Sequence, residues 1–225
     1  MNEYYQARKQ YIGPVARDYD RDRSRSPYDR WKWRRERATL SRTLEALGVM
    51  DRVLDVPTGT GRFLELLFEG SRRTIGLDLS PDMLMIARHR AEPRGIPLVC
   101  AEAECLPFAD GTFDLAVSIR FFQHLPPAAL EPILRELVRV SSGGLLLQAP
   151  LSNPISPLVR VLAEAARGRF GPGTRRSTQR YFPRSKRELV ADLDKWNLVL
   201  AAARPVTWRG GQLRLMHIRR GSRPS

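Results

Sequence analysis

The sequence predicts an α/β fold in which a doubly wound, mostly parallel sheet carries helices on both faces. Two neighbouring patterns support this prediction. The run V-L-D-V-P-T-G-T-G-R-F over residues 53–63 gives a buried strand, a glycine turn and a helix start. A second strand then ends in Asp78, which lies 23 residues after Asp55. Because doubly wound sheets hold nucleotide-like ligands with such a pair of strands, we expect a ligand site where both strands end.

The first strand and its turn have the residues that a buried strand and a tight loop require. Three of the first four residues of the run are apolar, as expected of a strand that is buried on both faces. Gly59 and Gly61 let the backbone turn sharply and come close to a ligand. The helix predicted over residues 63–68 therefore begins against that ligand.

Asp78 follows the strand predicted over residues 74–77, where a carboxylate can accept two hydrogen bonds from a ribose diol. Leu64 stands where the third glycine of a G-x-G-x-x-G fingerprint would be, and no Gly-Lys-Ser/Thr follows the loop. These two departures argue against a dinucleotide-dependent dehydrogenase and against a P-loop nucleotide site. A further helix is expected to start at Ser80-Pro81.

The run V-C-A-E-A-E-C-L-P-F-A-D-G-T-F-D over residues 99–114 resembles the G-D-A-E-x-L-P-F-x-D-x-x-F-D run of class I S-adenosylmethionine (SAM) dependent methyltransferases, including those of type 11. The glycine loop then resembles the first motif of that family, and Asp78 its ribose-binding acid. The resemblance extends over about residues 52–150. It implies a Rossmann-like doubly wound sheet of seven strands, mostly parallel with an antiparallel last strand, and SAM as the cofactor.

The same resemblance implies a role for each motif residue. Asp55 and the glycine loop would hold the methionine end of SAM, Leu79 would pack on the adenine, and Glu102 would lie at the adenine edge. Two residues depart from the family pattern, because Pro57 replaces its first glycine and Glu102 its usual aspartate. The cofactor-binding residues implied in this way are Asp55, Pro57, Gly59, Thr60, Gly61, Asp78, Leu79, Glu102, Ala103 and Arg120.

His124 is the candidate catalytic residue. It follows a strand predicted over residues 115–119, at the edge of the sheet where ligands bind. An imidazole with a pKa of about 6.5 can remove a proton from a substrate hydroxyl. The alternative is a histidine that only packs against its neighbours. No Asn/Asp-Pro-Pro-Tyr run stands here, so the signature for methylating exocyclic base nitrogens is missing.

We expect a single domain with four parts. The amino-terminal part is a basic arm, and the family resemblance implies that it forms a lid in which Tyr19-Asp20 or Tyr28-Asp29 closes over the cofactor; a partly disordered arm is the alternative. A helix over residues 35–47 follows it and ends at Gly48. Residues 1–50 form the arm or lid and the first helix, and residues 51–150 form the SAM-binding core, which includes a helix over 126–140 and a strand over 144–148. Residues 151–183 are an insertion, helical over 158–166, which the resemblance implies to cap the substrate pocket. Residues 184–225 hold the last helix and a strand pair over 198–203 and 212–218.

Composition restricts the partners of this chain. Its 225 residues carry a net charge of +14, and residues 151–225 hold 16 Lys/Arg against 4 Asp/Glu. Such flanks favour an anionic acceptor or surface, although solvated arginines explain them equally well. Cys100 and Cys105 are expected to be small buried residues, and they suggest no metal site. With no apolar run of membrane-spanning length and a polar amino terminus, we expect a cytoplasmic protein.

The sequence therefore predicts an enzyme that transfers the methyl group of SAM to a small molecule, and no residue pattern requires a metal. An RNA methyltransferase is the second candidate, favoured by the basic flanks but without a recognisable RNA-binding module. A SAM-binding protein without turnover is the third candidate. The acceptor atom and the oligomeric state stay open at this point.

Overall fold

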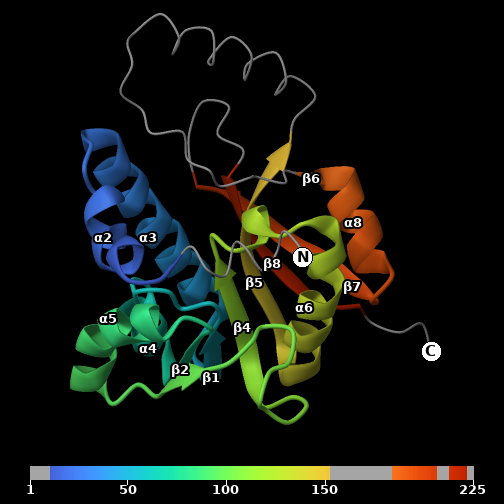
Figure 1. Ribbon diagram of the computed structural model, residues 1–225. Coiled ribbons are helices and arrows are strands. Elements are labelled where there is room, and N and C mark those ends of the chain that lie inside the picture. Colours follow the sequence, from blue (N-terminus) through green and yellow to red (C-terminus); the bar gives the residue numbers. More distant parts are fainter. Residues whose placement is uncertain (1–10, 153–183, 207–212, 222–225) are drawn as a thin grey trace, which may run out of the picture.

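The computed structural model describes residues 11–152, 184–206 and 213–221. Its strands form one sheet in the order β3-β2-β1-β4-β5-β8-β7, and the two-residue strand β6 pairs with β5 outside this path (Figure 1). The strands are β1 (Met50–Asp55), β2 (Ser71–Asp78), β3 (Leu98–Cys100), β4 (Phe113–Ile119), β5 (Ser141–Ser152), β6 (Arg184–Ser185), β7 (Leu198–Pro205) and β8 (Leu213–Arg220).

Strands β1 to β5 pair in parallel, and β8 runs antiparallel between β5 and β7. The predicted Rossmann-like sheet of seven strands with an antiparallel last strand is confirmed. Strand order reverses at β1, which lies between β2 and β4. In open α/β sheets, ligands bind outside the carboxyl ends of the strands at such a reversal.

Helices cover both faces of the sheet, with α3, α4 and α5 on one face and α6 and α8 on the other (Figure 1). Most begin and end within a few residues of the predicted bounds, but α3 begins eight residues before the predicted start at residue 35. Residues 153–183, nearly all of the predicted cap, lie outside the described residues. The helices are α2 (Pro14–Asp22), α3 (Pro27–Leu47), α4 (Leu64–Glu69), α5 (Pro81–Ala91), α6 (Pro127–Val140) and α8 (Lys186–Asp194), with 3₁₀ turns η1 (Glu92–Arg94) and η2 (Phe122–His124).

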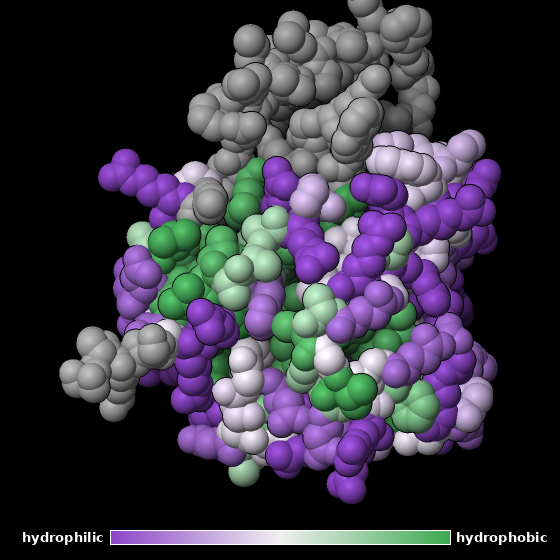
Figure 2. Space-filling view, turned by 180° about the vertical axis from the view of Figure 1, so that it is seen from behind, coloured by the Kyte–Doolittle hydropathy of each residue, from purple (hydrophilic) through white to green (hydrophobic). Residues whose placement is uncertain are grey.

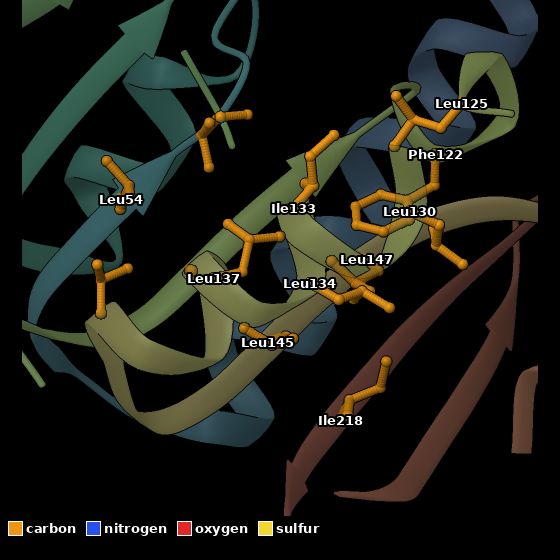
Figure 3. Close-up of a cluster of buried hydrophobic side chains, with 14 of the residues drawn as sticks. Leu54, Phe122, Leu125, Leu130, Ile133, Leu134, Leu137, Leu145, Leu147 and Ile218 are labelled. Carbon is orange, nitrogen blue, oxygen red and sulfur yellow. The ribbon is translucent and has the colours of Figure 1, made fainter. Parts of the chain in front are cut away.

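The core has two main layers because successive strand residues point to opposite faces. Leu145 and Leu147 of β5 belong to the cluster under α6 and α8, while Leu146 belongs to the cluster under α3 and α4. Figure 3 shows the first cluster, in which Ile133 and Leu137 of α6 lie over β4 and β5. Apolar residues on both faces hold the central strands rigidly, so that their carboxyl ends offer a fixed platform for a site.

The surface corrects one expectation from the sequence. Cys100 and Cys105, expected to be buried, are both exposed free cysteines. The reason is that Cys100 ends β3, the strand at the edge of the sheet, and Cys105 lies in the loop that follows. Figure 2 shows the back of the molecule, where hydrophilic residues surround a band of hydrophobic ones.

Candidate functional site

A cavity opens at the carboxyl ends of β1, β2 and β4, where the strand order reverses. Nine of the eleven predicted site residues line it. Gly61 and Glu102 do not, because Gly61 packs against α5 and Glu102 is exposed in the loop after β3. The nine are Asp55, Pro57, Gly59, Thr60, Asp78, Leu79, Ala103, Arg120 and His124.

The glycine loop is fastened to the end of β2. Gly59, at a φ of 58°, donates its backbone N–H to Asp78 Oδ2 over 2.8 Å, and Ser80 N–H donates to Asp78 Oδ1 over 2.9 Å. A carboxylate has about four acceptor positions. Asp78 therefore fixes the loop and still has acceptor positions for a ligand hydroxyl.

Gly61 is required for packing. It has a φ of 76°, and a Cβ atom built on it would lie 3.1 Å from the Cβ of Ala87 in α5. Such a contact is tighter than nine in ten real Cβ contacts, so Ala87 would have to move by a few tenths of an ångström, and the positive φ would strain any other residue at this position. The second glycine of the loop thus lets α5 approach the loop, while the first lets the loop bend toward Asp78.

Two buried carboxyl groups lie on the same side of the cavity. Burial raises the pKa of Asp55 to about 7, and the negative charge of Asp78 also raises it. The hydrogen bond of 2.7 Å that Thr58 Oγ1 donates to Asp55 acts in the opposite direction and lowers the pKa. Burial also raises the pKa of Asp78, although the backbone N–H groups of Ser80, Gly59 and Leu79 oppose this shift. A cationic ligand between these groups would favour their ionised forms.

Arg120 is held in the cavity wall by an ion pair with Glu36 of α3. It follows β4 with a φ of 60°, and its guanidinium pairs with both carboxylate oxygens of Glu36 in α3, with 2.9 Å between Nε and Oε1. Gln148 in β5 also donates to Glu36, over 3.4 Å. Since the Glu36 side chain is completely buried, this ion pair joins α3 to the cavity wall.

The amino-terminal helices close one side of the cavity. Of the two predicted Tyr-Asp pairs, Tyr19-Asp20 lies there: Tyr19 lines the cavity, and Asp20 accepts hydrogen bonds from Thr60 Oγ1 and Arg90 Nη2, each over 2.8 Å. In the other pair, Asp29 instead caps α3 by accepting from Ser26. Helix α2 is thereby tied to the glycine loop through one carboxylate.

His124 ends the 3₁₀ turn η2 and lines the cavity with Phe121 and Leu125. Its Nε2 lies 3.0 Å from the side-chain nitrogen of Gln123. The turn places the imidazole beyond the end of β4, as its position in the sequence predicts.

Several residues of the wall were not predicted. The motif pattern could not indicate Tyr11 and Met83, because they reach the cavity through tertiary packing, whereas Phe121 lies in the segment after β4 that the resemblance places at the pocket. Arg62 and Phe63 directly follow the glycine loop, so their position next to the motif is a signal that could have indicated them. These five all line the cavity.

The described residues hold neither a metal cluster nor a membrane-spanning helix. No group of three or more His, Cys, Asp and Glu side chains in residues 11–152, 184–206 and 213–221 is arranged to hold a metal ion. No helix in the same residues is long and apolar enough to span a membrane.

Comparisons with known proteins agree with this geometry. Residues 53–144 match the family model for a methyltransferase domain. Demethylmenaquinone methyltransferase of Thermus thermophilus is 42% identical over 118 residues, which cover 50% of this chain and 50% of that protein. The enzyme of the same name from Corynebacterium urealyticum is 39% identical over 109 residues, 48% of this chain and 44% of that protein. The chain spans about half the length of the curated relatives it matches.

Solved structures show the same fold. Magnesium protoporphyrin IX methyltransferase from Synechocystis PCC 6803, crystallised with bound SAH, superposes with a TM-score of 0.73 at 14% identity, over 98% of this chain and 100% of that one. The strand order, the glycine loop fastened to Asp78 and the match over residues 53–144 agree with one another, and this part of the chain is similar to a methyltransferase domain.

Proposed function

We propose that this protein binds SAM in the cavity and transfers its methyl group to a small-molecule acceptor. The observation that carries the proposal is the convergence of the motif residues. Three separate motifs, at Gly59, Asp78 and Ala103, contribute to the wall of one cavity at the reversal of the strand order. Chance resemblance of one motif would not bring the other two to the same place.

Each residue would hold a part of the cofactor that suits its chemistry. Asp78 would accept hydrogen bonds from the ribose hydroxyls, Leu79 and Ala103 would contact the adenine, and Glu102 would reach its edge. Asp55 would face the ammonium group of the methionine end, near Gly59, Thr60 and the short side chain of Pro57. Gly61 would act through the packing of the loop, and Arg120, the tenth residue proposed from the sequence, would contact the cofactor from the cavity wall.

Methyl transfer asks little covalent chemistry of the protein. The acceptor atom attacks the methyl carbon in line, the bond from that carbon to sulfur breaks, and S-adenosylhomocysteine (SAH) leaves with the electron pair. Because the sulfonium is already a strong electrophile, orientation and exclusion of water supply most of the acceleration, roughly 7 to 11 kcal/mol in well-aligned systems. For an oxygen acceptor, His124 would take the proton.

Calorimetry of SAM and SAH binding tests the cofactor site. Asp78→Asn should weaken both affinities by about 1.5 to 3 kcal/mol, because charge-assisted hydrogen bonds to the ribose are lost. Asp51→Asn is the matched control, since Asp51 lies exposed near the opposite end of β1. Equal affinities for the wild type and Asp78→Asn, with both proteins folded, would rule out this cofactor site.

Turnover needs its own experiment. The relatives are named demethylmenaquinone methyltransferases, so demethylmenaquinone is the first acceptor to incubate with enzyme and labelled SAM. Small-molecule and RNA extracts follow, with mass spectrometry of the labelled products. Label in the small-molecule fraction supports the proposal. Label found only in RNA would favour an RNA methyltransferase. Binding of SAM without any labelled product would favour a SAM-binding protein without turnover.

A further inference from the structure

The guanidinium of Arg62 stands in the cavity wall with its hydrogen-bonding groups unused. Its side chain is only 12% exposed, yet it donates no hydrogen bond to any of the described residues. Its ion-pair partner, Asp20 Oδ1, lies 3.8 Å away and already accepts from Thr60. An arginine carries five N–H donors in a planar fork, and those of Arg62 are not among the fully buried donors, so they remain accessible to a ligand. The structure therefore holds a cation that a ligand can satisfy.

Aromatic stacking fixes this cation in position. The Arg62 Cζ lies 4.0 Å from the centroid of the Trp33 ring in α3, and that ring lies 4.9 Å from Phe63. A guanidinium over an indole is held by cation–π attraction while its N–H edges stay available. Arg37 lies near the same ring at 5.8 Å, but it pairs with Glu65 and does not line the cavity.

A second cation, Arg120, lines the same cavity and lies close enough to act on Arg62. Burial lowers its pKa, and the positive charge of Arg120 lowers it further, with Asp20 acting in the opposite direction. Burial and Arg120 likewise lower the pKa of Lys32, which makes no hydrogen bond or ion pair within the described residues. Glu36 is engaged by Arg120 in a bidentate pair. Arg62 and Arg120 of the cavity wall thus repel one another, and an anion bound between them would relieve that repulsion.

We propose that Arg62 binds an anionic oxygen, a carboxylate or phenolate, of the methyl acceptor. The inference rests on the proposed function. SAM carries a sulfonium, an ammonium and a carboxylate, so the bound cofactor would add one net positive charge to the cavity. An anionic acceptor would then compensate both the cofactor and the wall. The apolar lining, which includes Phe63, Phe121 and Leu125, suits a body the size of an aromatic ring beside that charge.

A matched pair of probes tests the charge requirement. Benzoate and benzamide have the same shape and differ in charge, and calorimetry measures their binding to the SAH-loaded protein. We expect benzoate to bind and benzamide to bind at least about tenfold more weakly, as the loss of a charge-assisted hydrogen bond implies. Arg62→Met should weaken benzoate by a similar factor, Arg62→Lys by less, and the control Arg37→Met not at all.

The carboxylate of the cofactor itself is the competing ligand for Arg62. SAH carries that carboxylate and 5′-methylthioadenosine lacks it. If Arg62→Met weakens SAH binding and leaves 5′-methylthioadenosine unchanged, the guanidinium serves the cofactor and our assignment is overturned. The assignment of Arg62 is also overturned if the wild type binds benzoate and benzamide equally, or if Arg62→Met binds benzoate as tightly as the wild type does. In both cases the proposed function stands. Absence of SAH binding by the wild type would remove the proposed function and this inference together.

Discussion

At the scale of single residues, Asp55 is a buried carboxyl group of the candidate site whose ionisation is unfavourable in the folded protein. Its carboxyl group is buried at the end of β1, where burial raises its pKa to about 7. The hydroxyl of Thr58 is its hydrogen-bond donor in the structure. An ammonium or sulfonium group beside it would favour the ionised form. The chain thus keeps a buried carboxyl group with a raised pKa where a positively charged cofactor is proposed to bind.

The raised pKa of Asp55 predicts that the stability of the fold depends on pH. Because the folded pKa of Asp55 is raised above the unfolded value of 3.8, the stabilisation by its proton is complete below about pH 4 and is lost as the pH rises to about 7. Asp55→Asn removes the titration, so its advantage in unfolding free energy over the wild type should grow by roughly 2 kcal/mol between pH 5.5 and 8. Urea unfolding of both proteins measures this, and parallel pH profiles would contradict it.

His124 gives the second prediction at the residue scale. As a general base for an oxygen acceptor, it should contribute about a hundredfold to the rate of methyl transfer, so His124→Ala should lose that factor and keep its SAH affinity. His89→Ala is the control, because His89 lies exposed on α5. Single-turnover kinetics of the folded variants decides. A loss of less than about threefold would leave His124 as a packing residue, the role it would have with carbon or amine acceptors.

At the scale of elements, α3 was only half predicted, and the reason is local. The charged run before residue 35 has no apolar periodicity, which hides the first two turns of the helix. A capping box stands at its start, where the Ser26 side chain accepts from Asp29 N–H and the Asp29 side chain accepts from Ser26 N–H. The sequence S-P-Y-D carries that signal, since Ser, then Pro at the first position and an acid at the third are typical of a helix start.

The buried pair between Glu36 and Arg120 predicts how strongly α3 is joined to the sheet. Removing one member of such a pair leaves an uncompensated buried charge, which costs about 3 to 5 kcal/mol. We therefore expect Glu36→Gln to lower the free energy of unfolding by about 3 kcal/mol or more. In Glu131→Gln, which loses an exposed pair with Arg135, the change should stay below about 1 kcal/mol.

Chemical unfolding of the two variants provides this comparison. Adding Arg120→Met to Glu36→Gln should restore part of the lost stability, because the buried charge is then removed as well. Equal destabilisation by Glu36→Gln and Glu131→Gln would show that the buried pair does not anchor the helix.

For the molecule as a whole, the sequence predicts the sheet and the position of the cavity, because strand periodicity, glycine turns and an acid at the end of a strand are local signals. Asp55, Gly59 and Asp78 line the cavity as predicted. The sequence did not predict the wall around Arg62, since the contacts of Trp33 and Asp20 with it depend on how α2 and α3 pack against the glycine loop. Tertiary packing of this kind leaves no periodic pattern in the chain.

The net charge of +14 gives the last prediction, which concerns the whole molecule. The cations of residues 151–225 outnumber the acids 16 to 4, whereas residues 51–150 hold 10 cations against 13 acids. Under the proposed function, this charge serves a small anionic acceptor, so filter binding should show only weak RNA binding. A nucleic-acid enzyme would instead bind RNA tightly at low salt and lose affinity steeply as counterions are released.

A salt series separates the two cases. At about 50 mM salt we expect the protein to retain little RNA, and about as much as it retains of a carboxylate-free polyanion such as dextran sulfate. The reason is that both polymers would be attracted only by the net positive charge of the protein. Arg62→Met should leave this retention unchanged, because its guanidinium lies inside the cavity, 12% exposed. Tight RNA binding that falls by orders of magnitude between about 50 and 200 mM salt would instead favour the RNA methyltransferase, since that slope measures phosphates contacted by several cations at once.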